Sequence, residues 1–133
     1  MDQSPTPSFQ TLYHQYIDAF NAHSWEGVQA CLSPNVEIYV RGKLALKDDW
    51  EKLKKDFMDH WALPNARVSI PQLEEFENGV VVKVLDHARN QIVDVTYTYA
   101  LQEGKWLQVR HEVHEVTKVT AEQDDSADTR TGE

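Results

Sequence analysis

Residues 91–118 read QIVDVTYTYALQEGKWLQVRHEVHEVTK, and this stretch indicates how the chain folds. Apolar and polar residues alternate along both of its halves, which is the pattern of a β-strand with one buried face. Residues 103–105, with the sequence EGK, interrupt the alternation with a turn. We therefore expect two long antiparallel strands, over residues 91–101 and 106–118, joined by a tight hairpin.

Further strands are expected upstream of this hairpin. Residues 67–76 and 80–87 also alternate, and the Asn78-Gly79 pair between them is favoured in hairpin turns. Residues 35–40, with the sequence NVEIYV, alternate in the same way. The C-terminal half of the chain should therefore form an antiparallel meander.

Amphipathic helices are expected in the N-terminal half. Apolar residues recur at three- and four-residue steps over residues 9–20, with Ser8 as the N-cap. A second, short helix should cover residues 25–32, and two acidic residues mark the start of a third over residues 50–61. The resulting order, α-α-β-α-β-β-β-β, is typical of an α+β domain and does not fit a parallel sheet built from βαβ units.

The composition limits the kinds of partner that the chain can bind. Its 133 residues include 13 lysines and arginines against 22 aspartates and glutamates, which gives a net charge of −9. Such a surface repels phosphate groups, so we expect no nucleic-acid or anionic-membrane partner. The sequence has no apolar run that approaches the roughly 20 residues needed to cross a bilayer. We therefore expect a cytoplasmic protein.

The sequence divides into one domain and two polar ends. Residues 1–7 are expected to form a flexible arm, and the acidic residues 119–133 a disordered tail. Residues 8–118 should fold as a single domain with its own core. The single cysteine, Cys31, lies in an apolar helical context and is expected to be a buried structural thiol.

Three segments carry a family resemblance. They are YIDAFNAHSWEGV at residues 16–28, SPNVEI at residues 33–38 and EGKWLQV at residues 103–109. With them the chain resembles the nuclear transport factor 2-like superfamily, and within it the SnoaL-like group. The resemblance implies a cystatin-like α+β barrel, in which a cone-shaped, curved antiparallel sheet wraps around a long N-terminal helix and encloses an apolar pocket. It also implies a homodimer, which we expect to form through the outer face of the sheet.

The alternation on the last strand predicts which of its side chains face the pocket. The inward set, which is mostly apolar, comprises Leu107, Val109, His111, Val113 and Glu115. His111 and His114 are three positions apart and should point to opposite faces. They cannot then share a metal ion, so we expect no metal site. His114 should belong to an outer polar face.

The predicted site combines His111 with polar groups from other elements. Asp86 should orient the imidazole, which could then transfer protons at neutral pH. Tyr16, Tyr97 and Tyr99 could donate hydrogen bonds to a carbonyl or a developing oxyanion. The opposite interpretation, a core histidine bonded to a tyrosine or to the backbone, remains equally open.

The walls of the pocket should be apolar and aromatic. The residues expected to bind the substrate are Ile38, Trp50, Phe57, Trp61, Tyr99, Val109 and Val113. The sequence has no Gly-rich phosphate loop, which argues against a nucleotide, and we expect no cofactor.

The superfamily includes ketosteroid isomerases, polyketide cyclases, scytalone dehydratase, epoxide hydrolases and non-catalytic binding domains. Tyr16 matches the helix-one tyrosine of the isomerase oxyanion hole, but Ile38 stands where the isomerase has its catalytic aspartate. The resemblance therefore argues against ketosteroid isomerisation. Scytalone dehydratase uses two histidines, an aspartate and tyrosines, and His60 is a spare candidate for the second histidine beside His111.

These observations predict a small cofactor-free enzyme, a cyclase, isomerase or dehydratase. It would act by general acid–base catalysis on an apolar oxygenated small molecule such as a polyketide or terpenoid intermediate. The alternative is a non-catalytic ligand-binding or dimerisation module of the same fold. A cavity with His111 and Asp86 within hydrogen-bond distance of each other would favour the enzyme.

Overall fold

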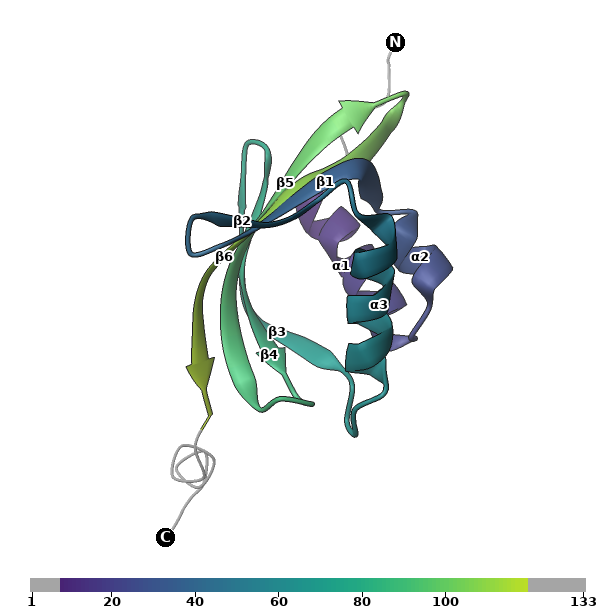
Figure 1. Ribbon diagram of the computed structural model, residues 1–133. Helices are drawn as coiled ribbons and strands as arrows, with labels where there is room; N and C mark the ends of the chain where they lie inside the picture. Colours follow the sequence, from purple (N-terminus) through teal and green to yellow (C-terminus); the bar gives the residue numbers. More distant parts are fainter. Residues whose placement is uncertain (1–7, 120–133) are drawn as a thin grey trace, which may run out of the picture.

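The computed structural model describes residues 8–119, which form three helices and six strands (Figure 1). The helices are α1 (Phe9–Asn21), α2 (Trp25–Gln29) and α3 (Trp50–Trp61). The strands are β1 (Leu32–Val40), β2 (Lys43–Lys47), β3 (Val68–Phe76), β4 (Gly79–Asp86), β5 (Gln91–Gln102) and β6 (Lys105–Lys118). The predicted arm over residues 1–7 and the predicted tail from residue 120 onward lie outside the described residues.

Side-chain caps explain where the three helices begin. Ser8, Ser24 and Asp49 each accept a hydrogen bond from the backbone N–H three residues further on. Each cap thereby satisfies a donor that the first helical turn leaves free. The helices therefore start at the positions that the sequence pattern predicts, although α2 ends earlier than expected because β1 already begins at Leu32.

The strands form one mixed sheet in the order β2-β1-β6-β5-β4-β3. Four of the five neighbouring pairs are antiparallel, whereas β1 and β6 run parallel. The α+β class and the meander from β3 to β6 are confirmed. The sheet is not wholly antiparallel as expected, because β1, which pairs antiparallel with β2 on one side, runs parallel to the last strand, β6, on its other side.

Strand β2 is an addition to the predicted element order. Arg41 and Gly42 have φ angles of 52° and 82°, which reverse the chain and pair β2 with β1. The five residues of β2, KLALK, place three apolar residues in a row and show no alternation of apolar and polar side chains. Only Leu46 among them is buried. Without that alternation the sequence gives no strand signal for this segment.

The sheet bends around the helices, which all lie on its concave side (Figure 1). The apolar stripe of α1 packs against this face, and its buried side chains are Phe9, Tyr13, Tyr16, Ile17 and Phe20. Inward-facing valines of β4 and β5 form the opposite side of the core. Among the described residues, no helix is long and apolar enough to cross a membrane.

A β-bulge in β6 alters the predicted alternation of its side chains. Thr98 and Tyr99, which are neighbours in β5, lie opposite Arg110 and Gln108, so the pairing skips Val109. An extra residue in one strand reverses the facing of every side chain beyond it. The prediction that Leu107 and Val109 face inward is therefore wrong, and Gln108 is the buried residue instead.

A second bulge lies near the end of β6. Asp94 and Val95 of β5 lie opposite Glu115 and Val113, so the pairing skips His114. This shift turns Glu115 outward, contrary to the prediction, and turns Val116 inward. His111 lies between the two bulges and keeps its predicted inward direction, with 6% of its surface exposed.

Gly79 is required for close packing between β4 and β5. A Cβ atom at this position would lie 1.9 Å from the backbone oxygen of Tyr97. The φ angle of Gly79 is not in the left-handed region, so the glycine serves the approach of the two backbones and not the hairpin turn.

We expect Gly79→Ala to lower the free energy of unfolding by about 2 kcal/mol, because the neighbouring strand must move to admit the methyl group. Urea denaturation followed by circular dichroism measures this change. Gly42→Asn is the matched control, since a Cβ at Gly42 meets nothing within 4 Å and asparagine tolerates a positive φ. Equal losses of stability in the two variants would contradict the packing role of Gly79.

Candidate active site

A cavity of about 350 Å³ lies between the concave face of the sheet and the helices. Its apolar wall is mostly aliphatic and consists of Ile17, Phe20, Ile38, Val40, Val68, Val84, Val93, Val95, Val113 and Val116. Its polar residues are Tyr16, His60, Asp86, Arg89, Gln91, Tyr97 and His111. A cavity of this size with an apolar wall and a few polar groups has the composition of a small-molecule site.

One end of the cavity is a cluster of phenol and imidazole rings. The ring centroid of His111 lies 4.6 Å from that of Tyr97 and 6.3 Å from that of Tyr16. Tyr13 packs behind them, with its centroid 4.7 Å from that of Tyr97. The hydroxyl of Tyr13 is buried and has no hydrogen-bond partner among the described residues. The cluster therefore concentrates hydroxyl groups in an otherwise apolar region.

Burial controls the ionisation of this cluster. It raises the pKa of Tyr16 well above its ordinary value and also raises the pKa of Tyr97, so both phenols keep their protons. Burial lowers the pKa of His111 from 6.5 to about 3. At neutral pH the imidazole is therefore uncharged, and it is a poor proton acceptor.

His111 is held by a buried amide and not by a carboxylate. Its Nε2 lies 2.6 Å from Oε1 of Gln108, whose Nε2 donates a hydrogen bond of 3.0 Å to the hydroxyl of Tyr99. Gln108 is fully buried. The expected contact between Asp86 and His111 is thus wrong, because the two residues lie at opposite ends of the cavity.

The pairing of the strands explains this separation. Val80 lies opposite Tyr97, which in turn lies opposite His111. Asp86 is at the far end of β4 from Val80, roughly 20 Å away at the usual rise of a strand. The cavity therefore carries two distinct polar regions, which we call the inner end (Tyr16, Tyr97 and His111) and the mouth (His60, Asp86 and Arg89).

At the mouth, Asp86 binds a different histidine from the one expected. Its Oδ1 accepts a hydrogen bond of 3.0 Å from Nε2 of His60, which lies in the last turn of α3. The same oxygen accepts hydrogen bonds from the backbone N–H groups of Ala88 and Arg89, at 3.0 and 3.2 Å. Asp86 thus joins α3 to the turn between β4 and β5.

The pKa of the Asp86 carboxyl is lower than usual. Burial by itself would raise it, but the hydrogen bond and charge of His60, together with the contacts of Arg89, outweigh that effect. The guanidinium of Arg89 lies 3.8 Å from Oδ2 of Asp86. The carboxylate therefore remains ionised and accepts the proton of one ring nitrogen of His60, which fixes the orientation of the imidazole.

The aromatic residues of α3 do not form the cavity wall as expected. Trp50 packs edge-on against Trp25 of α2, and Trp61 packs against Phe20 of α1. Phe57 lines only an adjoining opening, which it shares with His60. The expectation is wrong for Trp50 and Trp61, which pack against the other two helices, whereas Phe57 lies at the mouth, in an opening that also contains His60 and Arg89.

The remaining predicted substrate-binding residues divide between the two faces of the sheet. Ile38 and Val113 lie in the cavity wall. Tyr99 lies behind the wall, where it bonds Gln108. Val109 lies in a hollow on the outer face, beside Arg110, because of the bulge. The predictions for Tyr99 and Val109 are corrected accordingly.

Sequence reasoning missed Gln108 and underrated His60. Local alternation assigns Gln108 to the outer face, and only the bulge brings it inside. His60 lies near the end of an amphipathic helix, and no local signal connects it to a carboxylate 26 positions later. The turn after Asp86 offers a weak signal, since an aspartate that precedes a turn often accepts backbone hydrogen bonds.

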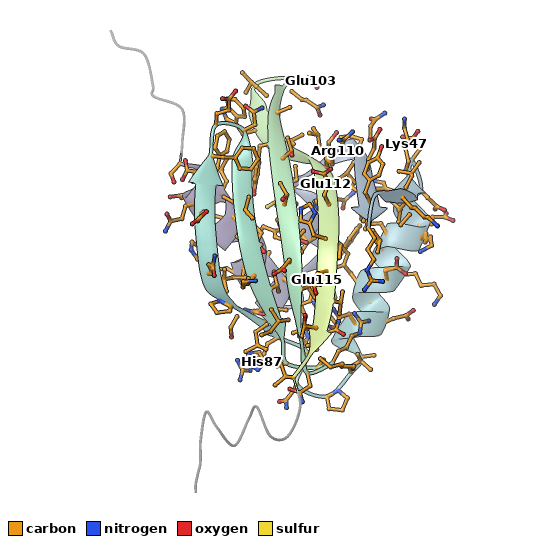
Figure 2. The ribbon with its side chains drawn as sticks, turned by 90° about the vertical axis from the view of Figure 1, so that its left-hand side faces the viewer. Lys47, His87, Glu103, Arg110, Glu112 and Glu115 are labelled. Carbon is orange, nitrogen blue, oxygen red and sulfur yellow. The ribbon has the colours of Figure 1, made fainter. Side chains whose placement is uncertain are left out.

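The outer face of the sheet is polar and charged. Figure 2 shows Arg110, Glu112 and Glu115 on the side of β6 that faces away from the helices. His114 is exposed on this face, and its Nε2 lies 2.7 Å from the Thr96 hydroxyl. Within residues 8–119, no three histidine, cysteine or acidic side chains gather closely enough to hold a metal ion.

Comparison with solved structures identifies the fold but not the activity. A scan of family models and a search of curated proteins give no match. A SnoaL-like protein of unknown function from Burkholderia thailandensis E264 shares 14% identity at a TM-score of 0.65, with 84% of this chain and 98% of that chain covered. An uncharacterised protein with a cystatin-like fold from Caulobacter vibrioides shares 13% identity at a TM-score of 0.62, with coverages of 90% and 92%.

A third similar structure is a protein from Kribbella flavida DSM 17836 that is provisionally described as a ketosteroid isomerase. It shares 15% identity at a TM-score of 0.55, and the alignment covers 79% of this chain and 75% of that chain. An NTF2-like protein of unknown function from Cytophaga hutchinsonii ATCC 33406 matches with 13% identity at a TM-score of 0.56, over 84% and 92% of the two chains. At such identities the likeness concerns the fold alone.

Proposed function

We propose that this chain, which has the nuclear transport factor 2-like fold, is a small acid–base enzyme that acts on an elongated, apolar, oxygen-bearing molecule. The observation that carries the proposal is the His60–Asp86 pair at the mouth of an aliphatic cavity whose inner end holds hydroxyl groups. The reaction class is cyclisation, isomerisation or dehydration of an intermediate such as a polyketide or terpenoid. These reactions need no oxidant, reductant or group carrier: the enzyme moves protons, the substrate's own atoms form the ring or shift the double bond, and in a dehydration the hydroxyl leaves as water, so the proposal includes no cofactor.

His60 is the proposed proton-transfer group. Asp86 fixes the orientation of the imidazole through Nε2, so Nδ1 can accept a proton from the substrate and return it at another position. The side chain of His60 is only 12% exposed, which limits competition from water. Arg89 at the same mouth can stabilise negative charge that develops on the substrate.

The inner end is proposed to bind the oxygen-bearing part of the molecule. Tyr16 and Tyr97 keep their protons and can donate hydrogen bonds inside a region of low polarity. His111, which we first expected to be the general base, becomes a binding residue in this proposal. Its pKa of about 3 leaves it too weak a base for proton abstraction near neutral pH.

The proposal is tested by a ligand screen followed by substitution of His60. Apolar aliphatic alcohols, ketones and hydroxy ketones are added to the full chain, tryptophan fluorescence reports binding, and nuclear magnetic resonance (NMR) of the ligands reports turnover or exchange of their protons with deuterium. We expect His60→Gln to bind the best ligand with unchanged affinity and to lose about 100-fold in exchange rate, because glutamine keeps the donor to Asp86 but cannot shuttle protons.

His87→Gln is the matched control, because His87 bonds Ser69 and does not line the cavity. This variant should retain the full exchange rate. An unchanged rate in His60→Gln would refute the proposed role of the His60–Asp86 pair.

One observation favours a second candidate function, ligand binding without turnover. The only histidine deep in the cavity among the described residues is uncharged and poorly basic, which suits a binding site as well as a catalytic one. Under this alternative, ligands would bind with the same preference, and no deuterium exchange would occur in either the native chain or His60→Gln.

Dimerisation through the charged outer face is compatible with both candidates. Sedimentation of the native chain, compared with that of Arg110→Glu, tests it.

A further inference from the structure

We propose that Gln108 is a positioning residue that holds the proton of His111 on Nε2, so that His111 offers a hydrogen-bond acceptor to the cavity and selects a hydroxyl group over a carbonyl group. The inference names the chemical group bound at the inner end, and in that respect it rests on the proposed function. The role of Gln108 toward His111 rests on the contacts alone.

The amide of Gln108 uses both of its ends in buried hydrogen bonds. Its oxygen faces Nε2 of His111 at 2.6 Å, and its nitrogen faces the hydroxyl of Tyr99 at 3.0 Å. Gln108 is completely buried, so an unused amide end could not bind water instead. In this orientation the amide oxygen requires a proton on Nε2 of His111.

The burial of His111 makes this choice of proton position decisive. The ring stays uncharged at neutral pH and therefore carries one N–H group only. If that proton lies on Nε2, the lone pair lies on Nδ1. Neither Gln108 nor Tyr99 lines the cavity, so Nε2 points out of it. Nδ1, which bonds no described residue, is the remaining polar atom that the ring can offer to a ligand.

The polar atoms of the inner end then match a hydroxyl group. A ligand hydroxyl can donate its proton to Nδ1 of His111 and accept a hydrogen bond from Tyr16 or Tyr97. A carbonyl oxygen has lone pairs only and would face the lone pair of Nδ1 without a proton between them. We expect the alcohol of a matched pair to bind about tenfold more tightly than the ketone, as one lost hydrogen bond implies.

The first measurement determines the position of the proton directly. NMR of the full chain labelled with nitrogen-15, with the His111 signals identified from His111→Gln, distinguishes the Nε2–H form from the Nδ1–H form. We expect Nε2–H in the native chain and a mixture in Gln108→Met, which keeps the volume but removes the acceptor. Gln72→Met, on the exposed face of β3, should leave the Nε2–H form unchanged.

Tyr99→Phe provides a second variant that keeps the core filled. It removes the partner of the Gln108 nitrogen, so the amide can rotate and the His111 signals should again show both forms. Because the backbone and the aromatic ring are retained, this variant tests the network even if Gln108→Met does not fold. An Nδ1–H form in the native chain, or an unchanged Nε2–H form in Tyr99→Phe, would overturn the positioning role.

The second measurement determines ligand preference with 4-tert-butylcyclohexanol and 4-tert-butylcyclohexanone. The ratio of the two dissociation constants should favour the alcohol about tenfold in the native chain and approach one in Gln108→Met. Equal binding, or a preference for the ketone, would overturn the inference while the deuterium-exchange result for His60 still decides the proposed function. If His60→Gln loses exchange and the native chain prefers the ketone, the acid–base function of His60 is retained and the hydroxyl selection by His111 is rejected.

Discussion

Asp86→Ala is expected to lower the free energy of unfolding by about 3–5 kcal/mol, the largest effect of any single substitution considered for this protein. Asp86 is 4% exposed, and its carboxylate accepts hydrogen bonds from His60 and from the backbone of Ala88 and Arg89. Alanine would leave these donors without an acceptor and would disconnect α3 from the turn between β4 and β5. Urea denaturation at neutral pH measures the loss.

Two further variants show whether the hydrogen bonds are responsible. Asp86→Asn keeps one acceptor oxygen and should lose less than half as much stability as Asp86→Ala. Asp94→Ala removes an aspartate from the neighbouring strand, where it pairs with Lys83 on the exposed outer face, and should cost at most about 1 kcal/mol. A similar loss in Asp86→Ala and Asp94→Ala would show that the buried network contributes little.

Acidification from neutral pH to about pH 4 is expected to lower the free energy of unfolding of the native chain by about 3 kcal/mol more than that of the His111→Gln variant. The imidazole takes up a proton near pH 6.5 in the unfolded chain but only near pH 3 in the folded chain. Between these values the unfolded state binds more protons, so stability falls as the pH falls. The stability is fully present above pH 6.5, and each pH unit below it costs about 1.4 kcal/mol.

The other groups with lowered pKa values do not produce the same difference. Asp86 contributes stability above its unfolded pKa of 3.8, and this stability is lost only at lower pH, outside most of the His111 interval. Burial also lowers the pKa of His87, but His87 is present in both proteins. Subtracting the urea-derived stabilities of the two proteins at each pH therefore isolates His111.

His114→Gln is the control for this measurement. It removes a histidine from the same strand, three positions away, on the exposed outer face. Its acid sensitivity should equal that of the native chain. If His111→Gln also retains the native acid sensitivity, the imidazole of His111 is protonated in the folded chain, and its proposed neutral, hydrogen-bond-accepting role is wrong.

Local patterns in the sequence predicted most of the architecture. The three- and four-residue steps of α1, the caps Ser8 and Ser24, and the alternation in β3 to β6 arise from the geometry of single elements. Neighbouring residues suffice to recognise them. The pairing of β1 with β6 depends on contacts between distant segments, and β2 carries no alternation of its own, so neither was predicted.

The same distinction between local patterns and long-range contacts applies to the candidate site. The sequence by itself determined that His111, Asp86, Tyr16 and Tyr97 face the interior, because strand and helix periodicity assigns each of them to a buried face. Only the tertiary structure decided which of these groups meet. The bulge at Val109 in β6, a single extra residue, brings Gln108 to His111, and the packing of α3 brings His60 to Asp86. The periodicity of a helix or strand fixes the facing of a side chain only within an uninterrupted stretch, whereas bulges and side-chain partners depend on how separate elements pack together.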